Sequence, residues 1–227
     1  MFTRTALEMN IISLLNFEDG IKDECGLTWY GNDRTTTDDK KFGTKSLYFS
    51  GQTIYCPISS IAPMYNQKDF SIGWWQRITG TDRYAGVVSS GFRGIIFFYF
   101  STYSIIDNIF TFIIGNGNDW FNNDGSTSAN INASQWHHFL FSKSDNKIMA
   151  YIDGKLIHSQ NYPGYNIGFG TNLIIGQWDN NGSTGYMDNF FISSEPIVND
   201  FDVSKPFKKI EKNNLILEDI ERNMYCN

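Results

Sequence analysis

The sequence predicts an all-β sandwich of two antiparallel sheets, with a short tail at its C-terminal end. Segments that alternate apolar and polar residues recur between residues 11 and 193, and clusters of turn-forming residues separate them. Of the 227 residues, 41% are hydrophobic and 16% are aromatic, which is enough for the core between two sheets. No clear helical period appears before residue 205, so the strands must pack against one another in one domain.

The clearest alternation begins at Phe70. Phe70, Ile72 and Trp74 fall on one face of this strand and are expected in the core, whereas Trp75 falls on the opposite face. Trp136 is likewise expected in the core. The predicted strands cover residues 11–17, 46–49, 70–78, 85–90, 94–100, 109–114, 136–142, 147–152, 155–159, 173–176 and 186–193.

Two signals organise the last third of the chain. Asp153 and Gly154 separate two predicted strands and are typical of a type I′ hairpin turn, because glycine accepts the positive φ that this turn demands. Pro206 marks a change in composition, which divides the chain into a domain at residues 1–204 and a tail at residues 205–227.

The tail carries apolar residues close to helical spacing within a charged background, at Ile210, Leu217, Ile220 and Met224. We therefore expect an amphipathic helix that packs on the domain. A strand is the alternative structure, and a second chain is the alternative packing partner.

Charge and hydropathy exclude two classes of partner. A net charge of −6 and an isoelectric point near 5.0 argue against binding a phosphate backbone, so no nucleic-acid partner is expected. No run of about 18 apolar residues occurs, so insertion into a membrane is not expected either. The first ten residues lack an apolar stretch and contain an acidic residue, and they do not predict a secretory signal.

The three cysteines, Cys25, Cys56 and Cys226, show no metal-binding spacing. Three thiols are favoured over one disulfide with one free thiol, because a core of this size does not need a disulfide. Both readings remain open.

Six motifs occur in the order in which one known family carries them. The most specific are Gln-Trp-His-His-Phe at residues 135–139, Tyr-Ile-Asp-Gly at 151–154 and Gly-Tyr-Met-Asp-Asn-Phe-Phe-Ile at 185–192. The other three motifs cover residues 14–20, 42–51 and 70–75. The chain thereby resembles the laminin-G-like, or concanavalin A-like, jelly rolls over about residues 11–205.

A closer resemblance is to the laminin-G-like proteins encoded by phages and prophages. Phe201 and Pro206 stand at positions similar to those of that group's closing segment, although its aromatic-Thr pair is missing here. The resemblance implies a two-sheet antiparallel jelly roll that acts as a recognition module. It also implies a place on a virion or at an extracellular or cell surface.

Catalysis is not expected. Retaining glycosidases of this fold need two carboxyl groups about 5 Å apart, and no predicted strand carries an acidic pair at the required spacing. His137 and His138 are neighbours on one strand and point to opposite faces, so they cannot hold one metal ion together with His158. We expect one of the two to be packed and the other to lie on the open face.

The resemblance implies one cofactor, a structural Ca²⁺ ion. Related jelly-roll modules hold this ion between a carboxylate of the first strand and a carboxylate of the last strand. Glu18 and Asp188 match those places, and carboxylate oxygens suit calcium. The alternative is that Glu18 serves a turn and Asp188 forms hydrogen bonds or an ion pair.

A glycan or cell-surface polysaccharide is the expected ligand. Sugars are recognised by flat aromatic faces surrounded by amide and carboxylate groups. Trp120 stands beside Asp119 in an asparagine-rich loop, and Trp178 stands near Asn180 in another. Trp75 is a third candidate, because it is predicted on the face opposite the core. The alternative for each indole is that it covers an edge of the sandwich.

A non-catalytic carbohydrate-binding or adhesion module of a phage particle or bacterial surface is therefore the first functional hypothesis. The second is a structural virion or assembly protein that uses the jelly roll as a building block. An oligomer is compatible with either hypothesis, and a monomer is slightly favoured, because one short apolar stripe buries little area.

Overall fold

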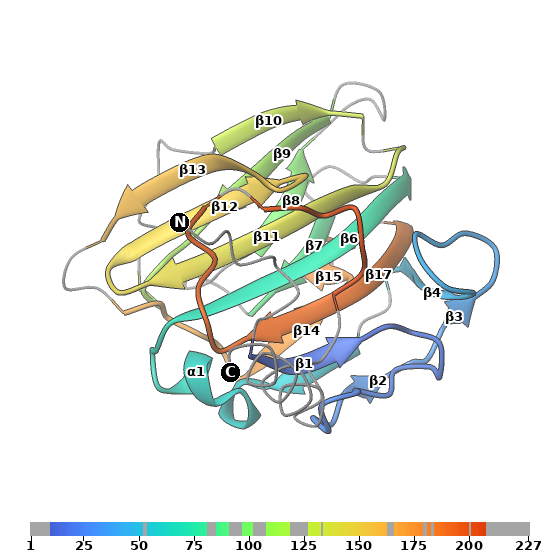
Figure 1. Ribbon diagram of the computed structural model, residues 1–227, viewed down its shortest axis with the longest axis horizontal. Coiled ribbons are helices and arrows are strands. Elements are labelled where there is room, and N and C mark those ends of the chain that lie inside the picture. Colours follow the sequence, from blue (N-terminus) through green and yellow to red (C-terminus); the bar gives the residue numbers. More distant parts are fainter. Residues whose placement is uncertain are drawn as a thin grey trace, which may run out of the picture.

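Two antiparallel sheets lie face to face and form a jelly-roll sandwich, which confirms the predicted fold (Figure 1). The computed structural model describes residues 10–51, 54–80, 85–90, 97–101, 108–118, 127–132, 134–162, 166–178, 181–182, 184–199 and 201–207. Of the expected C-terminal helix, only residues 205–207 belong to the described part, so the helix stays a prediction.

The first sheet faces the viewer in Figure 1, and β17 lies at its centre. The first half of β17 pairs with β4, its second half pairs with β1, and β6 pairs along its other side. In spatial order the strands are β13 (Lys155–Asn161), β12 (Lys147–Ile152), β11 (His137–Ser144), β6 (Phe70–Gly80), β17 (Thr184–Ser193), β4 (Ser46–Ser50) and β3 (Thr35–Thr36), with β1 (Ile11–Leu15) beside β17.

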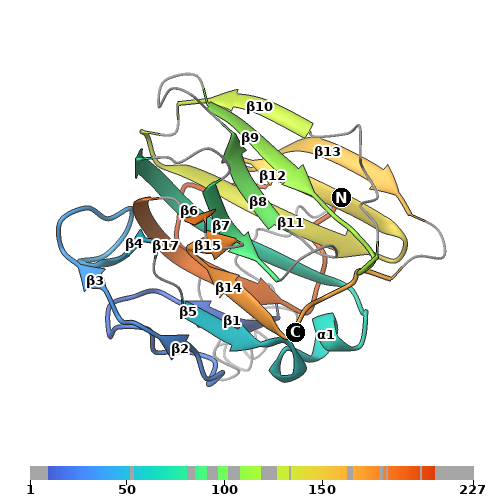
Figure 2. The same ribbon diagram turned by 180° about the vertical axis from the view of Figure 1, so that it is seen from behind.

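The second sheet comes to the front when the molecule is turned round (Figure 2). In spatial order its strands are β10 (Thr127–Ile131), β9 (Asn108–Ile113), β8 (Phe97–Ser101), β7 (Ala85–Ser89), β14 (Asn172–Ile175), β5 (Ile54–Pro57) and β2 (Tyr30–Gly31). Two further strands, β15 (Gln177–Trp178) and β16 (Asn181–Gly182), lie beside β7.

Short elements account for most of what the sequence did not predict. Four of the unpredicted strands contain two residues each, too few to show an alternation. A single-turn helix, α1 (Ala62–Tyr65), and a 3₁₀ turn, η2 (Ile58–Ser60), connect β5 to β6. No helix in the described residues is long and apolar enough to span a membrane.

The main core lies between the sheets and is rich in stacked aromatic rings. Phe70, Ile72 and Trp74 are fully buried there, as their alternation predicts. The Trp74 ring lies parallel to that of Phe139, with centroids 5.9 Å apart, and its indole N–H donates to the Gln76 amide oxygen at 2.8 Å. Because this donor is satisfied, burying the largest core side chain leaves no polar atom of it unpaired.

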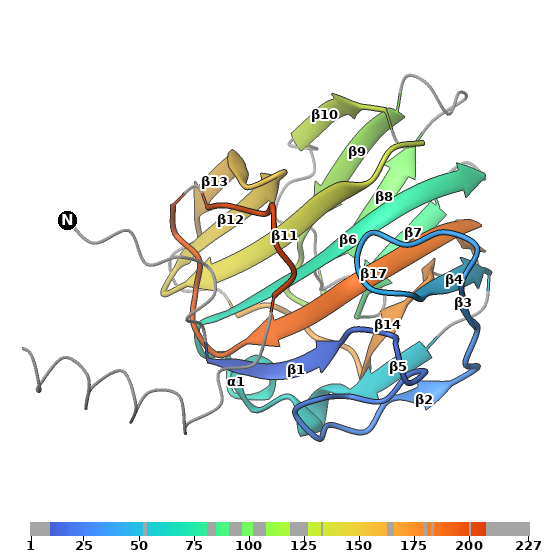
Figure 3. The same ribbon diagram turned by 45° about the vertical axis from the view of Figure 1, so that its right-hand side comes forward.

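The outer face of the first sheet is covered by the chain that follows β17. We call residues 195–199 and 201–207 the C-terminal strap; it crosses this face beside β12 and β11 (Figure 3). Phe207 packs on Phe191, with ring centroids 4.1 Å apart, and Phe201 packs on Tyr151 at 5.6 Å. The strap therefore buries a second, smaller apolar cluster outside the sandwich.

The Asp153–Gly154 turn is confirmed, since both residues have positive φ, 50° and 78°. Gly154 also receives the strap: its carbonyl accepts the Phe201 N–H at 3.0 Å. A Cβ atom on Gly154 would lie 2.1 Å from the Phe201 carbonyl oxygen. Glycine at this position thus serves both the turn and the close approach of the strap.

One expectation about side chains is wrong. Trp136 is only half-buried, and its indole N–H donates to the Asp39 carboxylate at 3.2 Å instead of packing in the core. Of the two histidines, His138 is the packed one: it shares the outer face of its sheet with Trp75, and it is fully buried there. The reason is the strap, whose Phe201 and Phe207 rings lie 5.5 and 5.4 Å from the imidazole.

Candidate functional site

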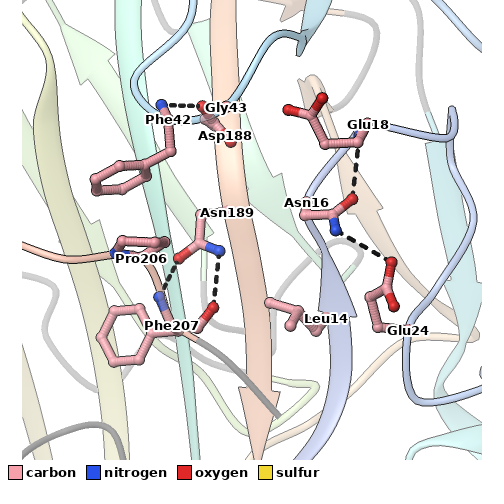
Figure 4. A pocket seen from close by; sticks show the side chains of 10 residues that line it. All are labelled: Leu14, Asn16, Glu18, Glu24, Phe42, Gly43, Asp188, Asn189, Pro206 and Phe207. Atoms are coloured by element: carbon pink, nitrogen blue, oxygen red, sulfur yellow. Dashed lines mark hydrogen bonds between the residues drawn. The ribbon is translucent and has the colours of Figure 1, made fainter.

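One pocket of about 460 Å³ gathers the residues expected to hold calcium. It opens between β1, β17, the loop that joins β3 to β4, and the end of the strap (Figure 4). Three carboxylates and two side-chain amides share it with apolar groups, so we call it the acidic pocket. Its lining residues are Leu14, Asn16, Glu18, Glu24, Phe42, Gly43, Asp188, Asn189, Pro206 and Phe207.

Asp188 anchors the middle of the β3–β4 loop. Its Oδ2 atom accepts the backbone N–H groups of Lys41 at 2.9 Å and Phe42 at 2.8 Å. Burial raises the pKa of Asp188 to about 6, against the pull of these hydrogen bonds, and the nearby charge of Glu18 raises it further. Glu18 and Asp188 are therefore close enough to interact electrostatically.

Glu18 anchors the end of the same loop. Its Oε1 atom accepts the backbone N–H groups of Thr44 at 2.8 Å and Lys45 at 3.2 Å, and the Thr44 hydroxyl donates to its other oxygen. Burial acts to raise the pKa of Glu18, but these bonds outweigh it and lower the pKa. A Cβ on Gly43 would lie 2.1 Å from the Glu18 carboxylate, so the loop closes tightly over it.

Asn16 connects Glu18 to another carboxylate of the acidic pocket, Glu24. The Asn16 side-chain oxygen accepts the Glu18 N–H at 3.0 Å, and its amide donates to Glu24 at 3.1 Å. In the described part of the chain, no three His, Cys, Asp or Glu side chains form a metal-binding cluster. A calcium ion here would therefore be held by Glu18 and Asp188 and completed by neutral oxygens, which suits its preference for oxygen ligands.

Trp75 lies on the outer face, as predicted, but it is not an open platform. Only 4% of the residue is exposed. The Phe42 ring meets the indole edge-on with centroids 5.8 Å apart, and the Lys41 ammonium lies 3.9 Å from the ring centroid. The loop held by Asp188 therefore covers Trp75, and a sugar cannot stack on it in this structure.

Neither histidine of the Trp-His-His motif lines the acidic pocket. His137 Nδ1 lies 2.7 Å from an Asp153 carboxylate oxygen; burial lowers its pKa, but this bond outweighs that effect and raises the pKa overall. Burial lowers the pKa of His138 to about 3, and neither of its ring nitrogens has a hydrogen-bond partner among the described residues. The pair points to opposite faces of the sheet, as expected.

A second pocket, of about 650 Å³, lies beside α1. Its rim includes Tyr65, which is 64% exposed, and its wall is the loop that precedes β14. We call it the Tyr65 pocket; it is lined by Pro57, Ile58, Ser59, Tyr65, Gln67, Ile167, Gly168, Phe169, Gly170, Thr171 and Asn172. Sequence reasoning missed it. The available signal was an aromatic residue next to amides, Tyr65-Asn66-Gln67, the same kind of signal that singled out Trp120.

The structure does not describe the side chains of the remaining glycan candidates. Asp119, Trp120 and Asn180 lie outside the described residues, and Trp178 is described only in its backbone, as part of β15. The base of the Trp120 loop is described, however. Residues 115–118 lie against the wall of the Tyr65 pocket, where Gly168 donates its N–H to the Gly115 carbonyl at 3.0 Å.

The chain belongs to the laminin-G-like domains of the concanavalin A-like lectin/glucanase superfamily. The family model matches residues 50–199, which include most strands of both sheets and the three most specific motifs. Among proteins with curated functions, none matches the chain in sequence.

Solved structures share the fold at low sequence identity. Domain 4 of the arabinanase AbnA from Geobacillus stearothermophilus, solved with arabinotriose, is 20% identical with a TM-score of 0.61; the match covers 84% of this chain and 95% of that one. The binding domain of botulinum neurotoxin DC, solved with SialylT, is 17% identical with a TM-score of 0.62. The binding domain of Paraclostridial mosquitocidal protein 1 is 16% identical with a TM-score of 0.60. This chain spans about half the length of each of these two domains.

Proposed function

We propose that the protein is a non-catalytic carbohydrate-binding or adhesion module. Its membership of a lectin and glucanase superfamily over residues 50–199 carries this proposal. The arabinanase domain that shares its fold over nearly its whole length was solved with an arabinose oligosaccharide, which supports the same class of ligand. The partner that we infer is a glycan or cell-surface polysaccharide. The module itself would belong to a phage particle or to a bacterial surface.

The binding branch of the superfamily fits better than the glucanase branch. A retaining glycosidase needs two carboxyl groups that flank the sugar bond. In the acidic pocket, Asp188 and Glu18 instead accept four backbone N–H groups of the β3–β4 loop. Carboxylates committed to backbone donors in this way hold a loop in place and are poorly placed to attack or protonate a substrate.

Calcium at Glu18 and Asp188 is part of the same proposal. The two carboxylates border one pocket with a third, Glu24, and the raised pKa of Asp188 reflects in part the negative charge beside it. A divalent cation would relieve that repulsion and would fix the loop that covers Trp75. The role of the calcium ion would be structural, because hydrogen bonds from backbone N–H groups already orient the Glu18 and Asp188 side chains toward the loop.

A glycan array that displays bacterial surface sugars tests the proposal. We expect weak binding, in the high-micromolar range, to a subset of sugars, since ordering and desolvation offset most of the contact energy at shallow sites. Trp120→Ala and Trp178→Ala should weaken it without lowering the melting temperature. An array without any bound sugar would refute the proposal and favour the alternative, a structural assembly protein, which predicts a stable oligomer instead.

A further inference from the structure

We propose that the Tyr65 pocket, which lies beside the base of the Trp120 loop, is a carbohydrate-binding site and that it takes a neutral oligosaccharide. This inference rests on the proposed function and adds to it a place and a ligand class. The pocket, of about 650 Å³, lies within the range of small-molecule sites. It combines an exposed aromatic ring with uncharged polar groups, which is the combination that recognises a pyranose or furanose ring.

Tyr65 supplies the aromatic surface. It is the last residue of α1, and it is 64% exposed, the largest exposed fraction among the large hydrophobic side chains of the described residues. A phenol ring left in water at the rim of a pocket gains from covering its face with the C–H groups of a sugar. No structural role within the domain explains why a tyrosine stands here. Among the described residues, none forms a hydrogen bond with the Tyr65 hydroxyl or stacks on its ring.

Hydrogen-bonding groups for sugar hydroxyls surround this ring. Ser59 and Thr171 are exposed residues of the lining, and Asn172 is half-buried in it. Within the described part of the chain, none of these three side chains has a hydrogen-bond partner. Hydroxyls and a carboxamide both donate and accept, so they match the hydroxyl pattern of a saccharide.

The wall of the pocket is braced in advance of any ligand. The Gln67 amide donates to the Ile167 carbonyl at 2.7 Å, and the Ile167 N–H donates to the Gln67 oxygen at 3.0 Å. Gly170 donates its N–H to the Ser90 carbonyl at 2.7 Å, and a Cβ on Gly168 would lie 2.0 Å from the Gly117 nitrogen. A wall fixed in this way reduces the ordering cost of binding.

Charge separates this pocket from the acidic pocket. None of the described residues that line the Tyr65 pocket is charged, whereas the acidic pocket carries Glu18, Glu24 and Asp188. A sialylated or uronate-containing glycan gains from a cationic group that offsets the loss of hydration of its carboxylate, and the described lining of the Tyr65 pocket offers none. Neutral sugars are therefore the class that fits.

The experiment is isothermal titration of the full-length protein with neutral oligosaccharides that score on the array, and with sialylated and uronate-containing ones as comparison. Tyr65→Ala should weaken binding of the neutral sugars by at least about tenfold, since an aromatic anchor at a binding surface typically contributes this much. Tyr65→Phe, which keeps the ring, should restore most of the affinity. Tyr30→Ala is the matched control, because Tyr30 is also exposed, at 47%, but lines neither pocket.

The two proposals fail in different ways. If the wild type binds sugars and Tyr65→Ala binds them equally well, the site lies elsewhere and only this inference is overturned. If the wild type prefers the acidic sugars, the ligand class is overturned. If the wild type binds no sugar at all, the proposed function fails and this inference fails with it. All three substitutions are at exposed positions, and equal melting temperatures would show that folding is unaffected.

Discussion

The side-chain amide of Asn189 binds both backbone polar groups of Phe207. The Phe207 N–H donates to Asn189 Oδ1 at 2.7 Å, and Asn189 Nδ2 donates to the Phe207 carbonyl at 3.2 Å. Asn189 lies in β17 with a positive φ of 47°, a conformation that asparagine tolerates better than most residues. The Asn189 side chain thus makes the two hydrogen bonds that the backbone of a neighbouring strand would otherwise make with Phe207. It thereby holds the end of the strap over His138.

Removal of this amide should loosen the strap. Asn189→Ala leaves two buried backbone groups of Phe207 without partners, so we expect a loss of about 2–4 kcal/mol in the free energy of unfolding, measured by urea denaturation. Asn189→Gly is the control, because it loses the same bonds while relieving the positive φ, and should lose somewhat less. If Asn189→Gly were as stable as the wild type, the amide would not hold the strap.

His138 should make the protein lose stability in acid. Its folded pKa of about 3 lies below its ordinary value of 6.5, so between these values the unfolded chain binds a proton that the folded chain does not. The free energy of unfolding should therefore fall as the pH drops through this window, by at most about 1.4 kcal/mol per pH unit. His138→Phe should lose less stability than the wild type between pH 7.5 and pH 5 in urea denaturation.

Asp188 provides a control, because its titration should change the free energy of unfolding with pH in the opposite direction. Its folded pKa of about 6 lies above the ordinary value of 3.8, so the folded chain binds the extra proton between these values, and stability rises as the pH falls. Asp188→Asn should therefore make the loss on acidification steeper. An unchanged acid response in His138→Phe would show that the buried imidazole does not govern it.

Calcium should raise the thermal stability if Glu18 and Asp188 hold it. An ion that binds only the folded state adds about 2.7 kcal/mol at a hundredfold excess over its dissociation constant. Thermal melts in millimolar Ca²⁺ and in EDTA measure this directly. Glu18→Gln should abolish the difference, while Mg²⁺ should have a smaller effect. Identical melting curves of the wild type in both buffers would show that Glu18 and Asp188 do not hold calcium.

Deletion of residues 208–227 tests the predicted tail. If these residues form a helix whose apolar stripe packs on the domain, their removal should lower the free energy of unfolding and leave a monomer, because an isolated helix of this length is marginal in water. Light scattering of both proteins measures the mass. A full-length oligomer that becomes a stable monomer on deletion would instead support the assembly protein.

The sequence was sufficient for most strands and for the main core. The alternation through Phe70, Ile72 and Trp74 identified the buried face of β6, and the Asp153–Gly154 pair identified a hairpin, because both signals are local. The end of β1 was placed too late. The strand stops at Leu15, and Phe17 has a positive φ of 61°. The strand propensity of phenylalanine does not predict this conformation.

Coverage of the outer face could not be predicted in the same way. Alternation put Trp75 on that face and showed that His137 and His138 point to opposite faces, but it could not show what lies above either face. Trp75 is covered by a loop more than thirty residues earlier in the chain, and His138 by a strap more than sixty residues later. The Tyr65 pocket escaped prediction for a related reason, since its two walls come from segments about a hundred residues apart.

The central claim is that this domain binds carbohydrate, and saturation-transfer NMR on the full-length protein tests it most directly. With neutral oligosaccharides in millimolar excess, irradiation of the protein should transfer saturation to the sugar ring protons, and the transfer should disappear with heat-unfolded protein and diminish in Tyr65→Ala. If no sugar of a broad neutral and acidic panel receives saturation from the folded wild type, the protein does not act as a carbohydrate-binding module.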